Sequence, residues 1–244
     1  MNGNIELESR LDRGRVYVIG DIHGRSDLLD RISAAIVSDL QANPVEESLV
    51  VTLGDYIDRG PDSRGVLDRL TRNPFPTEFV PLKGNHELML ESFLHDPSVA
   101  DHWRRLGGLE TLISYGVPVQ ALMVGKDYDH AAHALNAALP REHLEFIANL
   151  QTSLSVGKYF LCHAGVRPGV ALDRQDPNDL LWIREPFLGS RANFGKIVVH
   201  GHTPREKPEV LANRINIDTG AYMTSRLTCV VLGRESVRFL STGN

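Results

Sequence analysis

The sequence of 244 residues predicts an α/β fold in which short, buried strands end in polar loops. The apolar, β-branched runs at 15–20 and 48–53 each break directly into a polar loop, as buried strands of a parallel sheet do. Between them lies a stripe of apolar residues with a period of 3.6, which is typical of an amphipathic helix. The last third of the chain has short strand-like runs without long helices between them, which predicts a partly antiparallel arrangement.

The first third of the chain repeats a pattern of strand, helix and strand. The first helix is expected from Ser26, as its N-cap, to near Asn43-Pro44. A second helix is expected at Gly65–Arg72, and a third strand follows it at Glu78–Leu82. Strand, helix and strand in succession form the βαβ unit of α/β folds.

The segment 88–150 differs, and we interpret it as a helical insertion or cap. Helical stretches are expected at 87–94, 102–114 and 127–138, with no strand before Ser153. Later strands are expected at 158–162, 196–200, 214–217, 226–232 and 236–240. No internal repeat or low-complexity tract interrupts the chain. The simplest organisation is a single domain over 1–244.

Composition argues against several function classes. The formal net charge is −5, and no run of Lys and Arg marks a nucleic-acid or membrane surface. No apolar stretch reaches the roughly 18 residues of a membrane span, and the first residues do not form a signal peptide. We therefore expect a cytoplasmic protein without nucleic-acid or membrane partners. Cys162 and Cys229 lie in apolar runs, which suits reduced, buried thiols.

Five polar loops carry the candidate chemistry, and each follows an expected strand. They read GDIHG at 20–24, GDYIDRG at 54–60, GNHE at 84–87, HAG at 163–165 and HGHTP at 200–204. In an α/β sheet, loops at the carboxyl ends of strands converge on one crevice. We therefore expect residues that are far apart in the sequence to meet there.

The residue types in these loops indicate a metal site. Carboxylate, amide and imidazole groups without thiolate suit Mn, Fe or Zn better than Ca or a structural Zn. Asp21 and His23 are two residues apart on an extended chain, so both side chains can reach one ion. Asp55 has two carboxylate oxygens and can bridge two ions, and Asn85 can offer an uncharged oxygen. The sequence thus predicts a two-metal site.

The order of these motifs resembles the metallophosphoesterase superfamily, and within it the bacterial and phage-type members of the phosphoprotein phosphatase family. The motifs span Gly20 to Pro204, and the chain also has LWIRE at 181–185 and DTGA at 218–221. The resemblance implies a calcineurin-like fold, which is a central β-sandwich of mixed sheets flanked by helices. It also implies a hydrolase of phosphate monoesters, of the serine/threonine protein phosphatase type.

By this resemblance the cofactors are two divalent metal ions, with Mn²⁺ expected and Fe or Zn as alternatives. The ligands of the first ion would be Asp21, His23 and Asp55. Those of the second would be Asp55, Asn85, His163 and His202.

The resemblance also implies catalytic and phosphate-binding residues. Asp58 and His86 match the family's acid pair, in which Asp58 holds the imidazolium form of His86 and His86 protonates the leaving alkoxide. Arg59 and Arg184 match the phosphate clamps, whose forked hydrogen bonds a Lys does not reproduce.

Some features depart from the family pattern or have no motif. Pro204 replaces the second His of the superfamily's GHxH motif, so the first ion should lack a His that other branches possess. His200 is expected to support His202 rather than to bind metal. The eukaryotic SAPNY-like segment is absent. Trp103 and the stretch 107–116 are expected to pack the insertion onto the core, with a substrate groove as the alternative. The insertion's remaining histidines, expected at the surface, are His95, His102, His130, His133 and His143.

Three functions compete. The first is a phosphatase acting on phosphoserine and phosphothreonine in proteins, with a phosphoprotein or phosphopeptide as partner. The second is a hydrolase of small phosphorylated metabolites or dinucleoside polyphosphates. The third is a non-catalytic scaffold, which the intact motifs disfavour. A fold positions a phosphate but does not identify the group that carries it.

Overall fold

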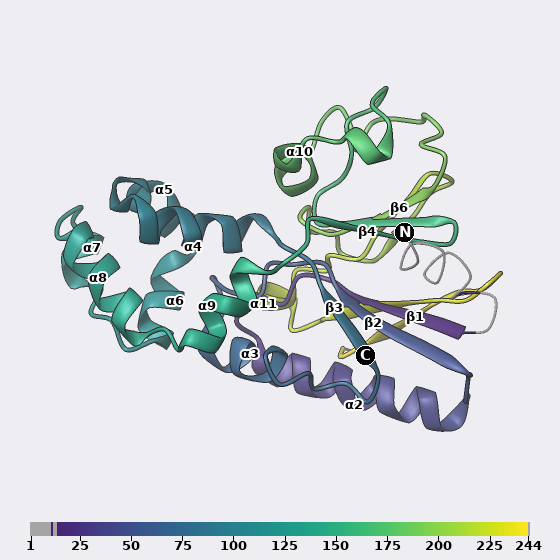
Figure 1. Cartoon of the computed structure of the whole chain (residues 1–244), viewed down its shortest axis with the longest axis horizontal. Coiled ribbons are helices and arrows are strands. Elements are labelled where there is room, and N and C mark those ends of the chain that lie inside the picture. The colour runs from purple at the N-terminus through teal and green to yellow at the C-terminus, as the bar shows by residue number, and fades with distance from the viewer. Residues whose placement is uncertain (1–10, 12–13, 244) are drawn as a thin grey trace.

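The computed structural model describes residue 11 and residues 14–243. Two five-stranded sheets form its centre (Figure 1). The first sheet has the order β10-β9-β1-β2-β3 and the second β4-β5-β6-β8-β7. In the first sheet β1 (Gly14–Ile19), β2 (Glu47–Thr52) and β3 (Glu78–Pro81) run parallel, and β9 (Thr228–Leu232) and β10 (Val237–Ser241) run antiparallel to their neighbours.

The second sheet is mixed as well. Its strands β5 (Tyr159–Cys162), β6 (Ile197–His200) and β8 (Arg214–Asn216) are parallel. The edge strands β4 (Ser153–Val156) and β7 (Glu209–Val210) pair antiparallel. The α/β sandwich of mixed sheets predicted from the sequence is therefore confirmed.

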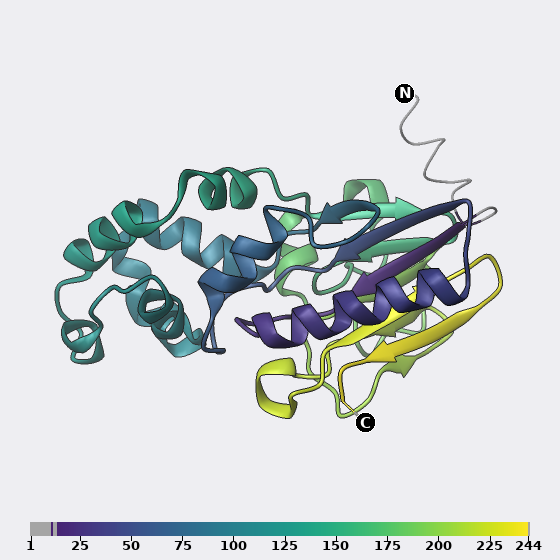
Figure 2. The same cartoon turned by 90° about the horizontal axis from the view of Figure 1, so that it is seen from below.

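Successive side chains of β1 point to opposite faces of the sheet, and this alternation explains how the sandwich is held together. Val16 and Val18 belong to the apolar cluster that also contains Leu161 and Val199 of the second sheet. Tyr17 points to the opposite face, where it joins the cluster formed with α2 (Ser26–Ala42) and α3 (Ser63–Leu70). Figure 2 shows α2 lying along this outer face. Both faces of the first sheet are thus covered, which is why its strands read as apolar runs.

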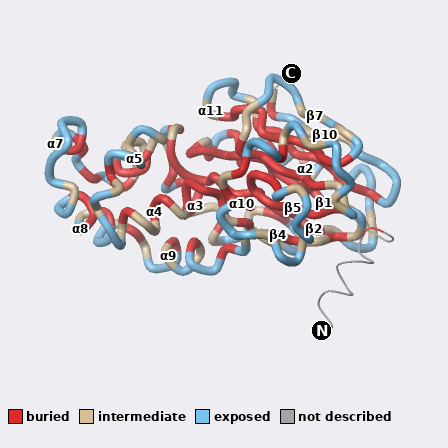
Figure 3. Tube along the Cα trace, turned by 90° about the horizontal axis from the view of Figure 1, so that it is seen from above, coloured by how far each residue is buried: buried red, intermediate tan, exposed pale blue. Residues whose placement is uncertain are grey.

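The insertion is helical, as predicted, and extends away from the sheets (Figure 1). It contains α4 (Asn85–His95), η1 (Pro97–Val99), α5 (Ala100–Leu106), α6 (Gly108–Ser114), α7 (Gln120–Met123), α8 (Tyr128–Ala138) and α9 (Arg141–Ala148). Figure 3 shows buried positions on the inner sides of these helices and exposed ones on α7 and α8. After β5 the chain adds η2 (Leu172–Arg174) and α10 (Pro177–Trp182), and α11 (Ala221–Thr224) precedes β9.

Several local predictions were wrong. The helix expected at 102–114 is two helices, because Gly107 has a left-handed φ of 105° at the junction of α5 and α6. The helices α7 and α9 were not expected. Ser26 is the first residue of α2 and not its cap, and its hydroxyl donates to Asp62 at 2.5 Å. Neither Cys162 nor Cys229 forms a disulfide, and both are buried, as predicted.

The surface prediction for the insertion's histidines holds for His95, His102, His130 and His133, which are exposed. It was wrong for His143, which is fully buried. Its Nδ1 lies 2.7 Å from the hydroxyl of Tyr115, and its Nε2 lies 3.1 Å from Oδ1 of Asp68 on α3. None of the helices in the described part of the chain has the length and hydropathy that a membrane span requires.

Candidate active site

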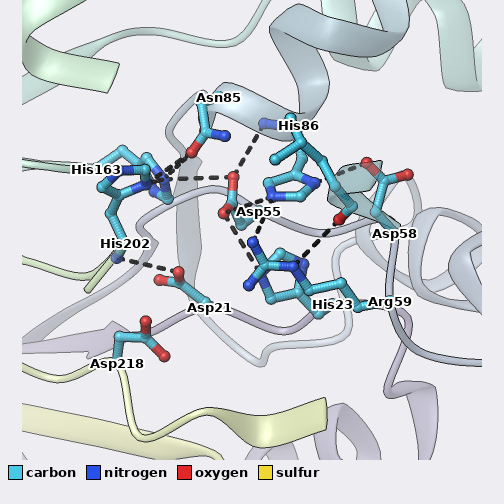
Figure 4. Close-up of polar contacts among 12 residues, drawn as sticks. Asp21, His23, Asp55, Asp58, Arg59, Asn85, His86, His163, His202 and Asp218 are labelled. Atoms are coloured by element: carbon cyan, nitrogen blue, oxygen red, sulfur yellow. Dashed lines mark hydrogen bonds and ion pairs between the residues drawn. The ribbon is translucent and has the colours of Figure 1, made fainter. Parts of the chain in front are cut away.

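The polar loops converge at the carboxyl ends of strands from both sheets, as Figure 4 shows. Asp21 and His23 follow β1, Asp55 follows β2, and Asn85 begins α4 after β3. The second sheet contributes His163 after β5 and His202 after β6. All six side chains are at most 7% exposed. Burial of so many polar groups is costly unless they are paired or hold ions.

Asp55 is the centre of the arrangement. Its Oδ1 lies 3.3 Å from Nε2 of His163, and its Oδ2 lies 3.4 Å from Nε2 of His23. Two groups of potential metal ligands, His23–Asp55–His86 and Asp55–His163–His202, share this carboxylate, and within each group the ligand atoms lie within 4.8 Å of one another. A carboxylate between two sets of imidazoles has the geometry of a bridging ligand.

The side of Asp55 toward the second sheet brings an amide oxygen and two imidazole nitrogens close together. Oδ1 of Asn85 lies 2.9 Å from Nε2 of His163 and 2.8 Å from Nδ1 of His202, and these two ring nitrogens are 3.2 Å apart. Nδ1 of His163 lies 3.0 Å from the carbonyl oxygen of Leu53. A proton on Nδ1 would leave the Nε2 lone pair facing the other ligands, as metal-binding histidines usually do.

The other side of Asp55 contains two buried atoms without hydrogen-bond partners. These are Nε2 of His23 and Oδ1 of Asp21. Nδ1 of His23 is 2.8 Å from the carbonyl oxygen of Ile57, and Oδ2 of Asp21 accepts the backbone N–H of His202 at 3.0 Å. Buried polar atoms are rarely left unpartnered. The orphaned nitrogen and oxygen fit a second cation next to the first.

The electrostatics of the site support this fit. Burial opposes a charge on His163, but the Asp55 carboxylate outweighs it and raises the pKa of His163 to about 9. Burial, followed by the nearby charge of Asp218, raises the pKa of Asp21 well above its ordinary value. The shift of His163 reflects the carboxylates around it, and the shift of Asp21 reflects first its burial and then a neighbouring carboxylate. The buried His and Asp clusters therefore fit a dinuclear metal centre.

Asp218 is a site residue whose role the sequence did not reveal. The segment DTGA was noted in the sequence, but nothing there assigned a function to the carboxylate. The structure places Asp218 beside Asp21 (Figure 4), 3% exposed, with Oδ1 accepting the backbone N–H of Gly220 at 2.9 Å. It increases the negative charge next to the ligand groups.

Asp58 and His86 form a buried pair. Nδ1 of His86 lies 2.6 Å from Oδ2 of Asp58, and both side chains are 0% exposed. The other ring nitrogen, Nε2, lies 3.7 Å from Oδ2 of Asp55 and 3.1 Å from Nη2 of Arg59. Burial lowers the pKa of His86, but the carboxylates of Asp55 and Asp58 prevail, and its pKa is raised above its ordinary value. The two residues predicted as an acid pair thus lie in contact with each other and next to the potential metal ligands.

The two predicted phosphate clamps are placed differently. Arg59 lies at the site, and its guanidinium carbon is 5.0 Å from the centre of the Tyr222 ring. Arg184 is exposed beyond the end of α10, and no hydrogen bond between Arg184 and the site is present among the described residues. Its charge lowers the pKa of His202, after the larger effects of burial and His163. Arg184 therefore lies near the site without contacting its other members.

His200 points away from the ligand groups. It is buried, its Nδ1 lies 3.1 Å from the carbonyl oxygen of Gly201, and its Nε2 lies 3.4 Å from Nη1 of Arg214. Burial and then the charge of Arg214 lower the pKa of His200 to about 3. His200 thus contacts Gly201, the residue before His202, and its expected support of His202 stays a prediction.

Backbone strain is concentrated at the site. Eight non-glycine residues of the described chain have a left-handed φ, and five of them are His23, Asp55, Asp58, Arg59 and His202. Such conformations cost of order 1–3 kcal/mol each and persist only where the surroundings enforce them. The strained backbone therefore lowers the stability of the fold, and it orients these five side chains toward the site.

Comparison with known proteins agrees with this site. The sequence pattern of the calcineurin-like phosphoesterases matches residues 14–233. The chain therefore belongs to the calcineurin-like phosphoesterase family. With the paired His and Asp clusters, it is a metal-dependent phosphoesterase.

Its relatives have two different substrates in their names. The chain is 29% identical over 233 residues to serine/threonine-protein phosphatase 2 of Salmonella typhimurium, covering 91% of this chain and 94% of the relative. It is 26% identical over 236 residues to bis(5′-nucleosyl)-tetraphosphatase PrpE of Anoxybacillus flavithermus, covering 87% and 88%. The solved structure of a candidate diadenosine tetraphosphatase has a similar fold, with a TM-score of 0.65, 19% identity and 95% coverage of both chains.

Proposed function

We propose that the protein is a phosphatase that hydrolyses phosphate monoesters, and that its substrates are phosphoserine and phosphothreonine in proteins. The observation that carries this proposal is the buried Asp58–His86 pair, whose second ring nitrogen lies 3.7 Å from Oδ2 of Asp55 and 3.1 Å from Nη2 of Arg59. The pair is built to hold a proton next to the site. The need for such a proton depends on the leaving group.

An alkoxide leaves far more reluctantly than a phosphate or a phenolate. The phenol of tyrosine has a pKa of about 10, whereas an alkyl alcohol is closer to the value of about 15.7 of bulk water. Serine and threonine esters therefore gain most from a proton donor. A phosphoanhydride, whose leaving group is already a stable anion, gains little. An intact acid pair thus favours monoesters of alcohols over dinucleoside polyphosphates.

We assign the metal ligands as the family resemblance implies. Asp21, His23 and Asp55 would hold the first ion. Asp55, Asn85, His163 and His202 would hold the second. Two bound divalent ions would supply water activation and charge neutralisation for the in-line displacement. We propose Mn²⁺ for both positions, with Fe or Zn as the alternatives, because imidazoles and oxygens without thiolate suit these ions.

The remaining residues would bind and orient the phosphate. Arg59 now donates toward Nε2 of His86 at 3.1 Å. When a phosphoryl oxygen of the substrate accepts the hydrogen bond of this guanidinium, Nε2 of His86 loses that bond. Nε2 can then carry the proton that the leaving oxygen receives. Asp58 keeps the ring in place through Nδ1. Arg184 would close on the phosphate from the side of α10 by a change of its side-chain conformation.

The second candidate function is hydrolysis of dinucleoside polyphosphates. It is supported by the tetraphosphatase relative, which matches 87% of this chain. This candidate uses the same metal ligands but does not need the acid pair.

One experiment separates the two. Phosphate release from phosphoserine, phosphothreonine and phosphotyrosine peptides and cleavage of diadenosine tetraphosphate are measured with the Mn²⁺-loaded protein. We expect a higher kcat/KM for the phosphoserine and phosphothreonine peptides. A higher kcat/KM for diadenosine tetraphosphate would overturn the proposal in favour of the second function.

A further inference from the structure

The helices α5 and α6 of the insertion each donate a side-chain hydrogen bond to the carboxylate of Asp58. The indole N–H of Trp103 donates to Oδ2 at 2.8 Å, and the hydroxyl of Thr111 donates to Oδ1 at 2.5 Å. Together with His86 on Oδ2, both carboxylate oxygens are occupied by buried donors. These contacts cross 45 and 53 residues of sequence.

The two donors constrain Asp58 in different ways. Trp103 is 1% exposed, and its indole nitrogen can only donate. Thr111 is 0% exposed, and its hydroxyl also accepts the backbone N–H of Asp58 at 2.9 Å. One side chain therefore holds both the backbone and the carboxylate of Asp58. These hydrogen bonds help to hold Asp58 in its strained, left-handed conformation, with a φ of 70°.

The same junction contacts the phosphate-binding arginine. The backbone N–H of Arg59 donates to the carbonyl oxygen of Gly107 at 3.1 Å, and its Nε donates to that of Leu106 at 3.3 Å. A Cβ at Gly107 would lie 2.7 Å from the backbone nitrogen of Arg59, and one at Gly108 would lie 2.4 Å from the indole of Trp103. Glycines here allow the helix junction to approach both residues closely.

We propose that Trp103 and Thr111 are positioning residues for the Asp58–His86 pair. By holding the Asp58 carboxylate in one orientation, they keep the His86 ring turned so that Nε2 faces the reacting phosphate ester. The insertion is then part of the catalytic apparatus. It determines how fast the enzyme hydrolyses esters whose leaving group needs a proton. This inference rests on the proposed function, in which His86 is the proton donor.

The test measures how activity depends on the leaving group. Trp103→Phe keeps an aromatic ring but removes the N–H that contacts Asp58. We expect it to lose part of the roughly 10²–10⁴-fold that general acid catalysis contributes on a phosphoserine peptide. The loss on an aryl phosphate with an acidic leaving group should be clearly smaller, with metal content, measured by elemental analysis, equal to wild type. Equal losses on both substrates, or no loss on either, would overturn the inference.

A matched pair at Thr111 gives a second, independent measurement. Thr111→Val removes the hydroxyl at nearly constant shape, and Thr111→Ser retains it. Only Thr111→Val should show the leaving-group-dependent loss. Phe93→Leu is a packing control, because the centroid of the Phe93 ring lies 4.7 Å from that of Trp103 and a phenyl ring has no N–H or O–H to donate to Asp58. A leaving-group-dependent loss in Phe93→Leu as large as in Trp103→Phe would show that packing, and not the hydrogen bond, is responsible.

His86→Asn in the same series separates this inference from the proposed function. If its loss does not depend on the leaving group, His86 is not the proton donor and the proposed function fails. If its loss does depend on the leaving group but those of Trp103→Phe and Thr111→Val do not, only the positioning roles are wrong.

Discussion

The carboxylate of Glu87 accepts the backbone N–H of Asp55 at 2.9 Å, so a side chain on α4 holds the backbone of the central site residue. The same carboxylate accepts the N–H groups of Tyr56 at 2.8 Å and Gly84 at 2.9 Å, and it is fully buried. It therefore ties the loop after β2 to the loop after β3. The first of these loops carries Asp55 and the second leads into Asn85, so Glu87 sets the distance between two ligand groups.

Glu87→Gln should weaken metal binding although Glu87 is not a proposed ligand. Glutamine would place an NH₂ donor against a backbone N–H, where an acceptor is required. We expect metal affinity to fall by roughly 10–100-fold, as is usual when a group that supports a ligand is lost. Isothermal titration with Mn²⁺ measures the change. Glu91→Gln, which alters the ion pair with Lys83 one turn along the same helix, is the control and should bind Mn²⁺ normally. Wild-type affinity in Glu87→Gln would refute this role.

Asp55→Asn and Asp58→Asn should differ in metal content. Asp55 lies between both ligand groups, so the loss of its charge should reduce binding of both ions. Asp58 contacts His86, Trp103 and Thr111, so its substitution should impair activity and leave metal content near normal. Elemental analysis after dialysis, together with phosphate release, distinguishes them. Equal metal content in the two variants would show that their roles are assigned wrongly.

Arg59→Ala should raise KM and lower kcat, because a clamp that tightens on the transition state contributes to both. Arg59→Lys should restore little, since an ammonium group does not reproduce the forked hydrogen bonds of a guanidinium. Arg184→Ala should cause the same kind of defect if Arg184 swings onto bound phosphate. Steady-state kinetics on one phosphopeptide compare all three. Wild-type kinetics in Arg184→Ala would place the second clamp elsewhere.

His143→Phe should destabilise the fold more at neutral pH than in acid. Burial lowers the pKa of His143 below its ordinary value of 6.5, although Asp68 opposes this. As pH falls through 6.5, the unfolded chain therefore takes up this proton before the folded one does, and stability from the neutral ring is lost. We expect a cost of about 1–3 kcal/mol at pH 7.5, from the unpaired Tyr115 hydroxyl, and a smaller cost at pH 5.

Urea unfolding of wild type and His143→Phe at both pH values checks this expectation. The exposed His133 provides the control, because His133→Asn should leave the free energy of unfolding nearly unchanged at either pH. A cost for His143→Phe that does not vary with pH would mean that the ring does not lose its neutral form on acidification.

Much of the proposed ligand set could be predicted to gather at one place because its signals are local. Each ligand lies one to four residues after an apolar run that forms a strand, and parallel strands bring their carboxyl ends to one edge. The sequence alone therefore predicts that Asp21, Asp55 and His163 lie at a common site. The roles of Asp58 and His86 as an acid pair came from the family resemblance, while their positions close to Asp55 and Asn85 tether both residues to the same loops.

The supporting residues could not be found in this way. No local pattern distinguishes Trp103 or Thr111 from ordinary helical residues, and the left-handed Gly107 interrupts what reads as one helix. Glu87 ends the GNHE motif, but nothing in the sequence gave it a role. His143 likewise reads as a surface residue until α9 packs against α3.

The sequence by itself therefore determined the α/β class, the order of the strands along the chain and the identity of the groups that gather at their ends. Hydrophobic periodicity and motif spacing act over a few residues, and they are present in the chain before it folds. Only the tertiary structure decided which side chains hold those groups in their orientation. It also decided that Arg184 makes no hydrogen bond to them among the described residues, and that Asp218 lies beside them. Each of these depends on contacts between segments far apart in the sequence, which exist only once the two sheets and the insertion have packed together.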